Sequence, residues 1–297
     1  RESLDKGIDY LHKAIDLDPG DPFAYAALAL GYAIRGQEHI DPDEAFLSAI
    51  YAADKAVRLD STIDMVHTAR ALLYLYQSWE WGKARASFEK ALAINPNNAI
   101  AHAHFARYYL LFQDVKKSLH HAKKAVTLEP FSSSYLAWLA LLYYMDHADE
   151  EAEFWARKSL KLKEDLPGGL LVLGGLPLDK RHYRQAVEYH ERLPRSVYYQ
   201  MHLGQTYVKS GNRGKAVELW NELEKRFDKG DVNPCYMGMM AAYLGYTDQA
   251  FELLNQACTM KSYPITYLDV YPCSENLRHD PRYEQLFVKM NLPYQSH

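Results

Sequence analysis

Two prolines, Pro96 and Pro130, lie 34 residues apart, and this spacing constrains the fold more than any other feature of the chain. The sequence between them contains two amphipathic helical segments joined by a short polar turn. The same spacing returns later, where Gly204 and Gly238 are also 34 residues apart. A helical pair of this length cannot bury its apolar face alone, so consecutive pairs stack and share a core. The sequence therefore predicts an array of helix–turn–helix repeats.

We predict that residues 1–297 form a single all-α domain, a right-handed α-solenoid of about seven such repeats. Half a repeat precedes the first complete one. Residues 280–291 leave the repeat pattern but keep a helical period, with Asp280 placed to cap the helix and Pro281 in its first turn. Because the last repeat of a solenoid exposes an apolar face, we expect this segment to be a C-terminal capping helix.

Residues 165–177 interrupt the pattern with four glycines and two prolines. Each lowers the stability of a helix interior, by roughly 1 kcal/mol for Gly and 3 kcal/mol for Pro. We expect a short or bent helix here and place a sub-boundary of the domain at 165–178. The stretch is either a degenerate repeat or a flexible joint between two parts of the solenoid. It lacks the glycine spacing and the Lys-Ser/Thr pair of a phosphate-binding loop.

The charge balance argues against a nucleic-acid or anionic-membrane surface. There are 34 Lys and Arg residues against 38 Asp and Glu residues, for a net charge of −4, and no basic run breaks this balance. No apolar run reaches the roughly 18 residues of a membrane span, and no signal-peptide pattern opens the chain. The chain begins inside a helical pattern without Met, so we expect it to be part of a longer protein.

The cysteines and histidines do not predict a metal site or catalysis. Cys235, Cys258 and Cys273 lack the close spacing of metal ligands, which predicts reduced thiols in a cytoplasmic protein. His102 and His104 are two residues apart, which places them on different faces of a helix, whereas an i, i+4 pair would bind one metal. No Ser/His/Asp or Cys/His set is recognisable. We predict a protein without catalytic residues, cofactor or metal.

The repeated pattern resembles the tetratricopeptide repeat. Its fullest copy has Ala84, Phe88, Ala91 and Pro96 at the spacing of the second half of that repeat. Further partial copies cover residues 25–32, 102–130, 136–156, 203–220 and 237–257. The resemblance extends over most of the chain, and residues 165–177 match it least.

A narrower resemblance concerns the end of the chain. The closing segment LRHDPRYEQLFVKMNLP, residues 277–293, together with Trp79-Glu80-Trp81, resembles the C-terminal repeat region of bacterial signalling proteins. In those proteins the repeats follow a winged-helix DNA-binding domain, an adenylate/guanylate cyclase domain or a serine/threonine kinase domain. This chain contains none of these effector domains, so the resemblance transfers no catalytic or DNA-binding residue.

The tetratricopeptide resemblance also implies a binding groove, because in such repeats the first helix of each pair lines the concave face. The residues of this sequence at groove positions include Leu72, Tyr76, Arg107, Leu111, Leu141, Tyr144, Tyr198, Met201 and Lys209. Most are apolar or aromatic, so we expect the groove to bind an amphipathic or extended apolar segment, with Arg107 and Lys209 supplying orienting charge. In the alternative interpretation, these side chains are ordinary core.

These observations predict a non-catalytic protein-interaction or regulatory module of a bacterial signalling or transcription-regulating protein. Its partner would be a protein or peptide segment, in another protein or in its own N-terminal effector domain, and not a nucleic acid or a membrane. Two alternatives stay open. One is a self-associating scaffold. The other is a subunit or regulatory part of an enzyme, such as a nucleotide cyclase, in which the solenoid binds a small molecule.

Overall fold

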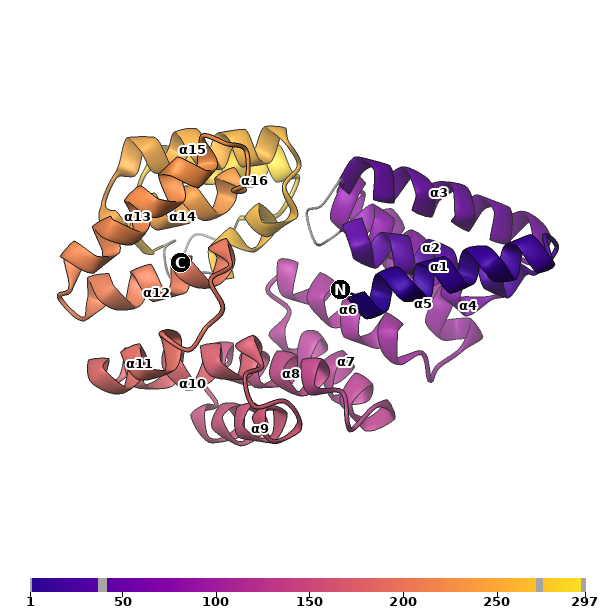
Figure 1. Cartoon of the computed structure of the whole chain (residues 1–297), viewed down its shortest axis with the longest axis horizontal. Coiled ribbons are helices and arrows are strands. Elements are labelled where there is room, and N and C mark those ends of the chain that lie inside the picture. The colour runs from indigo at the N-terminus through magenta and orange to yellow at the C-terminus, as the bar shows by residue number, and fades with distance from the viewer. Residues whose placement is uncertain (1, 37–41, 271–274, 295–297) are drawn as a thin grey trace. The chain divides into compact units, whose positions relative to one another are not determined.

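The computed structural model of the chain describes residues 2–36, 42–270 and 275–294. These residues form helices and turns without any strand, and successive helices pack in antiparallel pairs (Figure 1). The prediction of an all-α solenoid of helical repeats is confirmed. Contacts divide the chain into two compact units, residues 1–109 and 110–297. The division does not fall at residues 165–178, which lie inside the second unit, and a sub-boundary there stays a prediction.

The first unit contains the first helical pairs and the start of α6, which ends two residues beyond the unit. Its elements are α1 (Glu2–Leu17), α2 (Pro22–Gly36), α3 (Pro42–Leu59), α4 (Asp64–Leu73), the π-helix η1 (Tyr74–Ser78), α5 (Trp81–Ile94) and α6 (Ala99–Leu111).

The second unit contains the remaining pairs and the C-terminal helix. Its elements are α7 (Val115–Leu128), α8 (Ser133–Met145), α9 (Asp149–Leu162), α10 (Pro167–Asp179), α11 (Tyr183–His190), α12 (Val197–Lys209), α13 (Arg213–Phe227), α14 (Pro234–Leu244), α15 (Thr247–Thr259), the 3-10 helix η2 (Tyr263–Val270) and α16 (Pro281–Met290).

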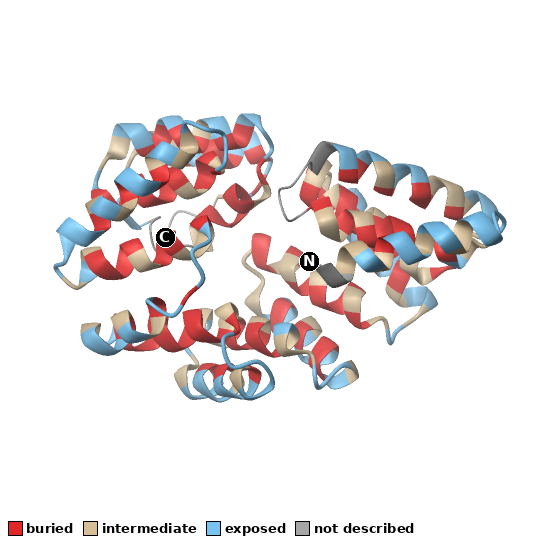
Figure 2. Ribbon diagram, viewed as in Figure 1, coloured by how far each residue is buried: buried red, intermediate tan, exposed pale blue. Residues whose placement is uncertain are grey.

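Small and aromatic residues at the repeat positions form the core. In α5, Ala84, Phe88 and Ala91 are fully buried, as expected for the face that packs on the neighbouring helices. The Phe88 ring stacks on the ring of Phe105 in α6, with centroids 5.0 Å apart and an angle of 20° between the ring planes. Figure 2 shows the same distribution in each unit, with buried residues on the faces where helices meet. The apolar repeat positions therefore hold successive helices together.

The 34-residue period is also visible in the backbone conformation of the turns that join the two helices of each repeat. The residues of these turns in the left-handed conformation are Trp79, Gln113, His147, Arg181, Gly211 and Gly245. Successive members are 34 residues apart, except Arg181 and Gly211, which are 30 apart. Left-handed residues end helices because the next N–H can then reach the carbonyl oxygen five residues earlier. One repeat of the second unit is therefore four residues shorter than its neighbours.

The glycine-rich stretch forms the helix α10, which packs against α8, α9, α11 and α12. Its glycines lie where neighbouring side chains come closest. A Cβ atom on Gly174 would lie 2.2 Å from the His190 ring, and one on Gly175 would lie 2.8 Å from the hydroxyl oxygen of Tyr144. The glycines thus allow close helix packing, which offsets their low helix propensity.

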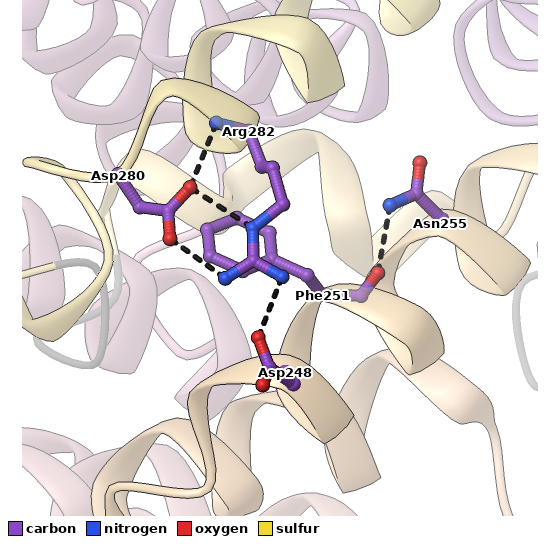
Figure 3. A network of polar contacts seen from close by, with 5 residues as sticks. All are labelled: Asp248, Phe251, Asn255, Asp280 and Arg282. Atoms are coloured by element: carbon purple, nitrogen blue, oxygen red, sulfur yellow. Dashed lines mark hydrogen bonds and ion pairs between the residues drawn. The ribbon is translucent and has the colours of Figure 1, made fainter.

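The segment expected to be a capping helix forms α16, which packs against α15. Asp280 is its N-cap and accepts a hydrogen bond from the backbone N–H of Arg282 at 2.9 Å. The Arg282 guanidinium bonds both Asp280 oxygens and Asp248 of α15, and it lies 4.3 Å from the centroid of the Phe251 ring (Figure 3). Hydrogen bonds from the Arg282 side chain and backbone lower the pKa of Asp280 to about 2.

Candidate functional site

Four of the predicted groove residues are buried. Leu72 and Met201 are fully buried, Tyr76 is 2% exposed, and Leu111 is 6% exposed. The Tyr76 hydroxyl is hydrogen-bonded to Nδ1 of His104, with 2.7 Å between the two atoms. Side chains in this state pack against neighbouring helices and leave almost no surface for a partner to contact. For these four residues the burial favours the alternative interpretation as core.

Arg107 is partly exposed and lies in the first unit, on α6. Burial lowers the pKa of His104 well below its ordinary value, and the positive charge of Arg107 lowers it further. His104 is therefore neutral beside this cation. Leu72 and Tyr76 lie in the same unit, whereas the other predicted groove residues lie in the second unit. The predicted groove residues thus form two sets, one in each unit.

In the second unit, the first helices of successive repeats form a row in which α8 contacts α10, α10 contacts α12, and α12 contacts α14. Leu141 and Tyr144 of α8 are partly exposed on this row. The Tyr144 hydroxyl donates a hydrogen bond to Oδ2 of Asp179, at the end of α10, with a distance of 2.6 Å. Burial raises the pKa of the Tyr144 hydroxyl, and the negative charge of Asp179 raises it further.

Tyr198 of α12 is partly exposed and belongs to an aromatic cluster. Its ring centroid lies 5.0 Å from that of His202 and 5.6 Å from that of Tyr236 on α14. Burial raises the pKa of Tyr236 well above its ordinary value. Lys209, at the end of α12, is exposed. The row therefore presents aromatic surface in its middle and a cation at one helix end.

The sequence-based mapping missed Tyr236, which joins the cluster from the next repeat. A signal for it was present, because His202 and Tyr236 are 34 residues apart and so occupy equivalent positions in neighbouring repeats. Equivalent positions of neighbouring repeats lie side by side in a solenoid, and here the rings at both positions contact the Tyr198 ring.

The described residues contain no group of three or more His, Cys, Asp or Glu side chains placed to hold a metal ion. His102 is hydrogen-bonded through Nε2 to the carbonyl oxygen of Pro96, at 3.1 Å. Cys235 and Cys258 are buried, and Cys273 lies outside the described residues. Burial raises the pKa of the Cys258 thiol to about 11. The Cys258 thiol is therefore protonated at neutral pH and unreactive, as expected for a cysteine that packs in a core.

Within the described part of the chain, no helix combines the length and the apolar character needed to cross a membrane. Neither a profile of a known protein family nor a curated protein matches the sequence.

Solved structures do match. The structure of the Cut9–Hcn1 hetero-tetramer of the APC/C aligns over 95% of this chain and 52% of that chain, with 14% identity and a TM-score of 0.62. A tetratricopeptide-repeat protein from Parabacteroides merdae aligns over 89% of this chain and 99% of that chain, with 16% identity and a TM-score of 0.57. PilF of Pseudomonas aeruginosa aligns over 76% and 94%, with 21% identity and a TM-score of 0.53. At these identities the likeness concerns the fold alone, and this chain has the fold of tetratricopeptide-repeat proteins.

Proposed function

We propose that the second unit is a protein-interaction module that binds a peptide segment of a partner on the row formed by α8, α10, α12 and α14. The observation that supports this most is the set of partly exposed apolar and aromatic side chains there, Leu141, Tyr144 and Tyr198. Aromatic side chains with a buried body and an accessible edge are the anchors that dominate protein interfaces. Lys209 would set the direction of the bound segment by pairing with an acidic residue.

We further propose that this module is the regulatory arm of a bacterial signalling protein. The support is the resemblance of residues 277–293 and of Trp79-Glu80-Trp81 to repeat regions that follow a DNA-binding, cyclase or kinase domain. The complete coding sequence around this chain tests the proposal. An effector domain of one of these three classes upstream of the repeats is the expected result, and a complete gene that encodes the repeats alone would refute it.

Capture of partners from a lysate of the source organism tests the interaction face. The face variant is Tyr198→Ser with Lys209→Glu. Its matched control, Phe154→Ser with Lys158→Glu, likewise replaces an aromatic residue by Ser and a Lys by Glu, but on α9, where both side chains are exposed. We expect the control to retain the proteins that the wild type retains, and the face variant to lose them.

Circular dichroism and thermal melting first establish that both variants fold as the wild type does. Equal capture by the face variant and the wild type would show that the row of first helices is not the binding face. Sedimentation velocity completes the test by measuring the oligomeric state of the purified chain. A scaffold that only associates with itself would form oligomers there and would retain its own chain and no other protein in the capture experiment.

A further inference from the structure

A polar contact joins the first turn of the second unit to its last helices. Gln113, in the turn between α6 and α7, donates a hydrogen bond from Nε2 to Oδ2 of Asp269 at 2.6 Å. Asp269 lies in η2, which packs against α14 and α15. The two residues are 156 positions apart in the sequence. In an open solenoid each repeat contacts only its neighbours, so this bond closes an array whose ends would otherwise be separate.

η2 is fixed to the last repeat. Ile265, near its centre, is fully buried, and the helix contacts both α14 and α15. Beyond η2, Asn276 donates a hydrogen bond from Nδ2 to the carbonyl oxygen of Ala242, in the last turn of α14, at 2.9 Å. Asp269 is therefore carried by the last repeat of the unit, whereas Gln113 is carried by the first turn.

The Asp269 carboxylate is also held from the side of the C-terminal helix. Its Oδ1 accepts hydrogen bonds from Nε of Arg278 at 3.1 Å and from the Tyr283 hydroxyl at 2.9 Å. The Asp269 side chain is 9% exposed, and its other oxygen accepts from Gln113. If the bond to Gln113 breaks, Arg278 still neutralises the carboxylate, and water can bond to the half-buried Gln113 amide. The contact can therefore open without leaving an unpaired charge buried.

This contact lies at one edge of the proposed interaction face. α8 and α14 are the two ends of the row that forms the face, and Tyr144 and Ala242 lie in their last turns. Gln113 follows the end of α6 in the same way. Burial and then Asp179 are the larger causes that raise the pKa of the Tyr144 hydroxyl, and the negative charge of Glu275 is a smaller one. The residues that follow η2 therefore lie near both ends of the row.

Closure fixes the curvature of the row. The curvature of a solenoid is the sum of small rotations between neighbouring repeats. Here the rotations occur where α8 contacts α10, α10 contacts α12, and α12 contacts α14. A small change at each of these interfaces adds up along the row, so the ends move further than any single pair of helices does. One contact between the ends therefore restrains all of the interfaces together.

We propose that the hydrogen bond between Gln113 and Asp269 is a latch that regulates the interaction face. With the latch closed, the row has a fixed curvature, and the residues around Glu275 partly screen Tyr144 from a partner. With the latch open, the ends of the row separate and Tyr144 becomes accessible. A peptide that binds the open form competes with the latch, so the closed form is autoinhibited. The inference rests on the proposed function, because it assigns the regulation of the same face.

Gln113→Glu tests the latch, because it keeps the shape of the side chain and replaces the amide donor by a carboxylate that repels Asp269. The matched control is Gln185→Glu, which makes the same change at an exposed position of α11. Neither replaced side chain is buried, so both variants should fold, and circular dichroism and thermal melting verify this.

The distance between two spin labels in the purified protein measures opening. The labels are attached at the exposed positions Lys124 of α7 and Glu252 of α15, on ketone-bearing residues that leave the cysteines unmodified. We expect the wild type and the control to share one short distance. Gln113→Glu should add longer distances and raise the ratio of open to closed molecules about tenfold or more, as expected for the loss of one hydrogen bond to a charged group. The same distance distribution in all three proteins would overturn the latch.

Oxidation of Tyr144 by hydroxyl radicals, read by mass spectrometry, tests the screening of the face. We expect at least twofold more oxidation in Gln113→Glu than in the wild type and no change in the control, with the exposed Tyr10 as internal reference. Equal oxidation of Tyr144 in all three proteins would overturn the autoinhibition. Neither measurement needs a partner, so a failure of the latch is distinguishable from a failure of the proposed function, which the capture experiment measures.

Discussion

The second unit should lose stability steeply as the pH falls below 6.5, because two of its histidines are buried in neutral form. Burial lowers the pKa of His190 to about 4 and the pKa of His202 to about 3. The His190 ring is hydrogen-bonded through Nδ1 to the Thr206 hydroxyl at 2.6 Å and through Nε2 to the Leu171 carbonyl at 3.2 Å. The carbonyl can only accept, so Nε2 carries the single proton of the neutral ring.

The sign of the effect follows from the proton balance. Both histidines have an ordinary pKa of 6.5, so between that pH and about 4 the unfolded chain binds more protons than the folded one. Stability is then present in full above pH 6.5 and decreases as the pH falls towards 4. Each such group contributes a slope of about 1.4 kcal/mol per pH unit. Between pH 7 and pH 5 the two together should lower the free energy of unfolding by roughly 3–4 kcal/mol.

Urea unfolding followed by circular dichroism measures this slope. The measurement is repeated at several pH values from about 7.5 to about 5, a range that spans the ordinary histidine pKa of roughly 6.5. Replacing His190 or His202 by Gln should remove about half of the slope that the pair contributes. His120→Gln, at an exposed position on α7, is the control and should leave the slope unchanged. If the variants and the control have the slope of the wild type, the two rings are not buried in neutral form and the reasoning fails.

Three further predictions concern packing. Gly174→Ala places a Cβ atom 2.2 Å from the His190 ring and should lower the free energy of unfolding by about 1–3 kcal/mol. Its control, Gly214→Ala, has no atom within 4 Å of the new Cβ and should be neutral or stabilising. Equal effects of the two substitutions in chemical denaturation would contradict this prediction. Arg282→Leu should accelerate hydrogen exchange of the α16 amides and leave those of α14 unchanged, and unaltered exchange in α16 would show that the Arg282 network does not hold the helix. Phe88→Ala should cost about 3–5 kcal/mol in urea unfolding, and a loss below about 1 kcal/mol would mean that the site collapses around the smaller side chain.

The spacing of 34 residues was sufficient to predict the fold class, because repeat period and amphipathic pattern are local properties of the sequence. The ends of helices could be predicted from local sequence as well. At the C-terminus, Asp280 and Pro281 predicted the start of α16, and the N-cap hydrogen bond forms there. Such ends depend on a few neighbouring residues, so they can be read without knowledge of the tertiary structure.

The exposure of the groove residues could not be predicted, since it depends on how closely neighbouring helices approach. Leu72 and Tyr144 both occupy first-helix positions, yet Leu72 is fully buried and Tyr144 is partly exposed. The glycines of α10 show the same limit. Their low helix propensity predicted a short or bent helix, whereas α10 has 13 residues, the same number as α8 and α12, and its glycines lie close to His190 and Tyr144. Propensity is a weak prior wherever tertiary packing is dense.

The short repeat has a consequence for how such arrays change over time. Each repeat packs mainly on its two neighbours, so removing one turn from α11 leaves the turns at Arg181 and Gly211 in the same conformation as the others. In such an array the effect of a small deletion therefore stays local to one repeat. A change in the length of one helix can in this way alter the surface beside one repeat while the backbone of the other turns stays the same.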